Sequence, residues 1–126
     1  GRPIPPEWDG ESLLPLLDAP APPAGWRDAQ LMELDFAEPG RPTRFERAWG
    51  TGPTESGAAI LRAGRWKYVA FAGPLPPLLF DLAEDPGETR DLAAEAPAEA
   101  ARMAEALLRR RLRHAGRRRA HLAVGV

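Results

Sequence analysis

Four acidic side chains form the densest group in the sequence that could do chemistry: Asp81, Glu84, Asp85 and Glu88. Carboxylate oxygens are the ligands that Ca²⁺ prefers. A dedicated calcium loop, however, carries Asp or Asn at alternating positions before a glycine, and that spacing is absent here. Asp85 is followed by proline and glycine, which favour a β-turn. We therefore predict a turn at 85–88 and not a metal site.

The two histidines are a second candidate for metal chemistry. His114 and His121 are seven residues apart, but Gly116 lies between them and no third donor is close in sequence. Protein zinc sites use three or four donors. The sequence has no cysteine, which excludes thiolate ligands, thiol nucleophiles and disulfides. We predict that both histidines are solvated and bind no metal.

Arginines gather at the C-terminal end of the chain. Residues 102–126 contain eight arginines and one acidic residue, whereas residues 1–101 contain 9 basic and 17 acidic residues. Arginines can neutralise phosphates, but no aromatic residues alternate with these, and the rest of the chain is acidic. We predict contact with acidic protein surface and no binding of nucleic acid.

Trp66, Lys67 and Tyr68 combine a base with two aromatic rings, as a platform for stacking nucleobases would. Strand alternation places Trp66 and Tyr68 on one face, where such rings ordinarily cover a sheet. We predict that they pack in a core or at a domain interface.

Length and composition are those of one soluble domain. The chain has 126 residues, of which 44% are hydrophobic and 28% are charged. No apolar run approaches the roughly 18 residues of a membrane span, and no signal peptide is recognisable. We expect no membrane partner and a cytoplasmic location. Because the first residue is Gly1 and the methionines are Met32 and Met103, we also expect a processed or excised segment.

The elements that position these residues follow from periodicity. Seven prolines among the first 23 residues predict a connector over 1–28, in which Ser12 caps a short turn of docking leucines. Strands are predicted from Ala29, where Met32, Leu34 and Phe36 alternate with acidic residues, and over 58–62, 65–72 and 78–82. Ala63-Gly64 is predicted to join the second strand to the third.

Two helices complete the prediction. Residues 42–49 form a short helix with Pro42 in its first turn and Gly50 at its end. A long helix begins near Pro97, carries an apolar stripe and ends at Gly116. The fold class is therefore α+β, a small antiparallel sheet of about four strands packed against a C-terminal helix. We divide the chain into a connector (1–28), an α+β unit (29–116) and a basic tail (117–126).

Several motifs follow one another along the chain. They are Asp-Gly-Glu-Ser-Leu-Leu-Pro-Leu-Leu (9–17), Trp-Arg-Asp-Ala (26–29), Arg-Trp-Lys-Tyr-Val-Ala-Phe (65–71), Leu-Pro-Pro-Leu-Leu-Phe-Asp-Leu (75–82), and Asp-Pro-Gly-Glu (85–88) with Asp91-Leu92. Their order resembles the C-terminal region of the sulfatase branch of the alkaline phosphatase superfamily. The motifs at 26–29 and 75–82 are most similar to phosphonate monoester hydrolases.

The resemblance implies a larger enzyme whose α/β domain hydrolyses sulfate, phosphonate or phosphate esters. It implies a formylglycine made within a Cys/Ser-x-Pro-x-Arg motif, and a divalent metal held by Asp and His. Ser12 and Ser56 lack the Pro and Arg of that motif, and the nearest string, residues 40–44, has glycine in the nucleophile position. We predict no catalytic, cofactor-binding or metal-binding residues in this chain, and an inactive, structural role.

The partner implied by the resemblance is the catalytic domain of the same enzyme, and the basic tail could also reach a second copy in a homo-oligomer. A competing interpretation is a freestanding interaction or oligomerisation module, in which the docking leucines and the basic tail bind a different protein.

Overall fold

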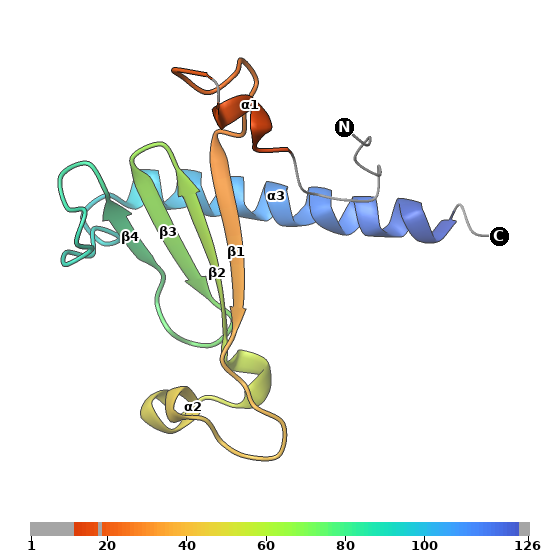
Figure 1. Cartoon of the computed structure of the whole chain (residues 1–126). Helices are drawn as coiled ribbons and strands as arrows, with labels where there is room; N and C mark the ends of the chain where they lie inside the picture. Colours follow the sequence, from red (N-terminus) through yellow and green to blue (C-terminus); the bar gives the residue numbers. More distant parts are fainter. Residues whose placement is uncertain (1–11, 18, 124–126) are drawn as a thin grey trace.

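A four-stranded antiparallel sheet carries one long helix across one of its faces (Figure 1). The computed structural model describes residues 12–17 and 19–123, the last eight of them as backbone only. The strands follow the chain in simple order: β1 (Ala29–Asp35), β2 (Gly57–Ala63), β3 (Trp66–Phe71) and β4 (Leu78–Asp81). The predicted α+β class is confirmed.

The hairpin between β2 and β3 turns one residue later than predicted. Ala63 pairs with Trp66, so Gly64 and Arg65 form the two-residue connection. Gly64 has a φ of 57°, which glycine adopts without the steric cost of a side chain. The pairing continues for one more residue because Ala63 still packs against the core under the helix.

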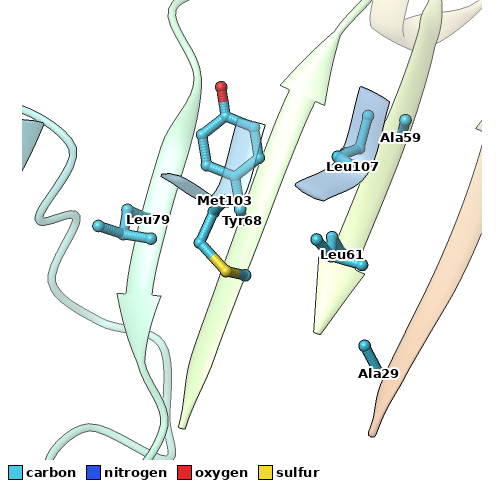
Figure 2. Packing of buried hydrophobic residues seen from close by; sticks show 7 residues of the cluster. All are labelled: Ala29, Ala59, Leu61, Tyr68, Leu79, Met103 and Leu107. Carbon is cyan, nitrogen blue, oxygen red and sulfur yellow. The ribbon is translucent and has the colours of Figure 1, made fainter. Parts of the chain in front are cut away.

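Helix α3 (Pro97–Ala123) supplies the other half of the core. Leu61, Leu79 and Met103 are fully buried, and Figure 2 shows Met103 of α3 beside Tyr68 and Leu79 of the sheet. Trp66 and Tyr68 both belong to this cluster, which confirms that the two rings share the covered face. Burial of apolar side chains between helix and sheet is the main force that holds the helix in place.

The predicted end of α3 at Gly116 is wrong, because the helix continues to Ala123. Glycine costs only about 1 kcal/mol in a helix interior, and the residues around it are alanines and arginines, which favour helix. Only the first part of the apolar stripe on α3 is buried. Met103 and Leu107 are buried, whereas Leu108 and Leu112 are 55% and 62% exposed.

Helix α2 (Arg44–Trp49) begins two residues later than the predicted Pro42. Thr43 is its N-cap, and Thr43 and Glu46 form a reciprocal capping box. Gly50 ends the helix in the left-handed conformation at φ 65°, as predicted. A single 3₁₀ turn, η1 (Pro53–Glu55), leads from there to β2. These caps account for a short helix that buries little apolar surface.

A short helix, α1 (Leu14–Leu17), lies in the predicted connector. The Ser12 hydroxyl accepts a hydrogen bond from the Leu14 N–H at 3.3 Å, which confirms its capping role. Leu13, Leu14 and Leu17 are exposed. Three of the seven prolines that define the connector, Pro3, Pro5 and Pro6, lie outside the described residues, and its extended form stays a prediction.

Candidate docking surface

The four acidic residues at 81–88 make separate contacts that stabilise the structure. Arg65 makes a two-pronged ion pair with Asp81, in which Nε donates to Oδ1 at 2.7 Å. Glu84 is 3.6 Å from the same guanidinium, and Glu88 pairs with Lys67 across the sheet edge. The hydrogen bond to Arg65 is the main reason why the pKa of Asp81 lies below its ordinary value of 3.8.

Asp85 organises the loop after β4. Its carboxylate accepts the backbone N–H groups of Thr89 and Arg90 at 2.7 and 2.8 Å and the Thr89 hydroxyl at 3.1 Å. The bond from the Arg90 N–H contributes most to lowering the pKa of Asp85. The Glu88 N–H donates to the Asp85 carbonyl at 3.1 Å, which confirms the turn predicted at 85–88.

Among the side chains that the structure describes, at 12–17 and 19–115, no three Asp, Glu, His or Cys residues are grouped so that they could hold a metal ion. His114 is exposed, and the side chain of His121 lies outside the described part. Ser56 is fully buried, where its hydroxyl donates to the Gly52 carbonyl at 2.8 Å and lies 3.1 Å from the Thr51 hydroxyl. The string at 40–44 leads into α2, where Thr43 is the N-cap and Arg44 the first helical residue.

The face of the sheet that α3 does not cover is also apolar. We call it the open face. In strand register it contains one row of Met32, Ile60, Val69 and Leu78, and a second row of Leu34, Ala58 and Phe71. Figure 1 shows no helix across it. Part of this face is buried within the chain, because Ala58 and Val69 join Phe80 in a second core cluster, and its exposed part is Met32 and Leu34 of β1. Exposed apolar side chains that lie together are candidates for an interaction surface.

The two β1 residues on the open face are its most exposed part. The strand predicted from Ala29 is confirmed, and Met32 is 52% exposed and Leu34 is 44% exposed on it. Leu31, on the other face, packs under α3 instead. Phe36 is the exception, because its ring stacks on Phe45 with centroids 4.7 Å apart. Alternation reveals two faces but not which one is covered.

Two basic residues of α3 contact acidic residues elsewhere in the chain, as the sequence predicts. Arg110 pairs with Asp28 at 2.6 Å and Arg111 with Glu33 at 2.8 Å, and both bonds tie α3 to β1 and the residue before it. Arg109 pairs with Glu105 within the helix. No described helix combines the length and the apolar character that crossing a bilayer requires.

Comparison with known proteins gives this surface a context. No family model matches the sequence. The chain is 37% identical over 119 residues to the multifunctional alkaline phosphatase superfamily protein PehA of Trinickia caryophylli, covering 90% of this chain and 22% of PehA. It is 32% identical over 90 residues to arylsulfatase K of Danio rerio, covering 70% of this chain and 15% of that protein.

A solved structure agrees with these relatives. The phosphonate monoester hydrolase SpPMH from Silicibacter pomeroyi superimposes with a TM-score of 0.76 and 42% identity, over 88% of this chain and 22% of that one. The homologues and structural neighbours of this chain are members of the sulfatase and alkaline phosphatase superfamily, phosphonate monoester hydrolases among them. It spans about a fifth of the length of PehA and SpPMH.

The motifs that carried the resemblance have structural roles in this chain. Asp81 closes the β2–β3 turn through Arg65, and Asp85 fixes the loop that follows. Asp91 accepts the Leu79 N–H at 3.0 Å, and the Leu92 N–H donates to the Leu79 carbonyl at 2.8 Å. Sequence reasoning assigned the Asp85 turn correctly but did not identify the Arg65–Asp81 or Asp91–Leu79 contacts, which join residues distant in sequence.

Proposed function

We propose that this chain is the C-terminal structural subdomain of a sulfatase or phosphonate monoester hydrolase-like enzyme that cleaves sulfate, phosphonate or phosphate esters. One observation carries the proposal: at 42% identity, 88% of the chain superimposes on only 22% of a phosphonate monoester hydrolase. The catalytic domain of the same enzyme is the proposed partner.

The open face and the α1 leucines form the proposed docking surface. Burying them would remove exposed apolar area from water at roughly 25 cal/mol per Å². The described residues do not fit the metal and the formylglycine that the superfamily implies, because no group of donors is present among them. We therefore assign this chain no step of the reaction. Its proposed contribution is to hold the catalytic domain and to shape the rim of its cleft.

The competing proposal is a freestanding interaction module that uses the same surface. The exposed leucines of α1 and α3 support it as well as they support a subdomain. The coding sequence upstream separates the two. A Cys/Ser-x-Pro-x-Arg motif and an Asp-His-Gly metal motif in the same reading frame identify the enzyme, and a start codon directly before Gly1 identifies the module.

An activity assay tests the structural role. The purified chain is expected to release no nitrophenol from p-nitrophenyl sulfate or p-nitrophenyl phenylphosphonate, whereas the longer protein that contains it is expected to cleave at least one of them. Hydrolysis by the purified chain that a point substitution within it abolishes would overturn the proposal.

A further inference from the structure

The two edge strands of the sheet, β4 and β1, differ in whether their outward backbone groups are hydrogen-bonded. At β4, the outward N–H and carbonyl of Leu79 are bonded to Asp91 and Leu92, and the Asp81 carbonyl accepts the Asp85 N–H at 2.8 Å. At β1, no described strand lies on the outer side. An open edge strand presents a row of backbone donors and acceptors that can pair with another strand.

The hydrogen-bond alternation identifies which β1 residues face outward. The Phe36 N–H donates to the Ser56 carbonyl at 2.7 Å, in the register that continues from Asp35 and Gly57. In an antiparallel pair, alternate residues bond to the same neighbour. Met32 and Leu34 therefore bond to β2, as Phe36 does. The backbone groups of the residues between them, at 31, 33 and 35, point to the free edge.

Helix α3 extends past this edge (Figure 1). The ion pair between Arg111 and Glu33 fixes the point at which the helix crosses β1. The residues from 112 to 123 continue for about 18 Å at ~1.5 Å per residue. Neighbouring strands lie only about 4.8 Å apart. The helix is therefore long enough to cover a further strand beside β1.

A groove of about 650 Å³ lies where that strand would run, between Leu31 and Glu33 of β1 and Leu108, Arg111 and Leu112 of α3. Both leucines of α3 are more than half exposed. On the opposite side of the same edge, the side chains of the open face at 32 and 34 are exposed as well. A strand placed here would meet apolar side chains on both of its faces.

We propose that the free edge of β1 pairs with a fifth strand, which the rest of the longer protein supplies. The C-terminal half of α3 would cover this strand. The inference rests on the proposed function, because the chain spans only about a fifth of its relatives and the strand comes from the remainder. The occupant is an extended segment that is apolar on both faces, because Arg109, Arg110 and Arg111 already pair with Glu105, Asp28 and Glu33.

Amide hydrogen exchange tests the proposal directly. The amides of Leu31, Glu33 and Asp35 are expected to exchange at least about tenfold more slowly in the longer protein than in the chain alone. The amides of Met32 and Leu34, already bonded to β2, serve as internal references. Equal exchange of the three outward amides in both proteins would overturn the proposal. Slowing that rises with the concentration of the isolated chain would assign the edge to a second copy and would also overturn it.

Two substitutions at Glu33 distinguish the contribution of its backbone N–H from that of its side chain. Glu33→Pro removes an outward N–H that β2 does not use, and Glu33→Ala removes only the carboxylate that pairs with Arg111. E33P is expected to lower Tm more than E33A in both proteins, because proline also fixes φ, and the difference between the two variants is expected to be larger in the longer protein, where the outward N–H is used. An equal difference in both proteins contradicts a fifth strand. Ester hydrolysis by the longer protein is assayed separately, so failure of the edge leaves the proposed function standing.

Discussion

Individual polar residues in this chain stabilise loops more than they create reactivity. The Asp81 carboxylate accepts hydrogen bonds from Nε and Nη2 of the Arg65 guanidinium and from the Ala83 N–H at 3.1 Å. Its side chain is only 9% exposed, so a carboxylate there requires such partners. The same guanidinium lies over the Trp66 ring at 5.6 Å. One arginine thereby connects the β2–β3 turn, the end of β4 and the aromatic edge of the core.

Replacement of Asp81 by Asn is expected to lower stability at neutral pH and to reduce its dependence on acid pH. Because Arg65 lowers the pKa of Asp81 in the folded chain below 3.8, the stabilisation is complete above that value and is lost as pH falls through the folded pKa. Urea unfolding followed by tryptophan fluorescence, from about pH 7 to about pH 3, measures the difference. The gap between wild type and D81N should narrow below about pH 4.

Asp85 provides the control for this measurement. Its pKa is lowered by other bonds, mainly from the Arg90 N–H, so D81N should retain part of the acid sensitivity. A gap between wild type and D81N that stays constant over the whole pH range would contradict the role given to the Arg65–Asp81 pair.

Among the elements, α3 best illustrates what the sequence could predict. Its start at Pro97 and its apolar stripe were predictable from helical periodicity, and the structure confirms both. Its end was not predictable, because one glycine does not stop a helix whose neighbours favour it. Nor does the spacing distinguish Met103, buried against the sheet, from Leu112, which lies beyond it. The position at which the helix crosses the sheet decides which of the two side chains is buried.

The two halves of α3 should respond differently to truncation. Met103→Ala removes a fully buried side chain and is expected to destabilise the chain by roughly 2–5 kcal/mol. Leu112→Ala removes an exposed side chain from the same stripe and should change the free energy of unfolding by less than about 0.5 kcal/mol. Chemical denaturation of both variants checks this. Similar losses for the two would show that the distal half already packs within the isolated chain.

At the scale of the whole molecule, α3 covers one face of the sheet, and the other face is buried only in part, around Ala58, Val69 and Phe80. Strand positions were predictable from alternation and turn residues, but alternation does not say how far each face is buried, and Met32 and Leu34 are 52% and 44% exposed. Burial of a strand face depends on contacts that lie outside the strand, and the relatives extend well beyond the matched segment. The absence of reactive side chains, by contrast, was inferred from composition and motif spacing and stays a prediction.

The exposed end of the open face should control the association of the isolated chain. Wild type is expected to self-associate or aggregate, because exposed apolar area favours association in water. The double variant Met32→Glu with Leu34→Lys should restore a monomer by light scattering. Both positions are already exposed, so the variant should keep its Tm. Trp49→Lys removes an exposed ring on α2, which is not part of the open face, and should leave the association unchanged.

In the longer protein, the double variant should instead lower Tm, because the charges would enter a buried contact. A monomeric wild-type chain with cooperative melting, or a longer protein indifferent to the two charges, would contradict docking through this face.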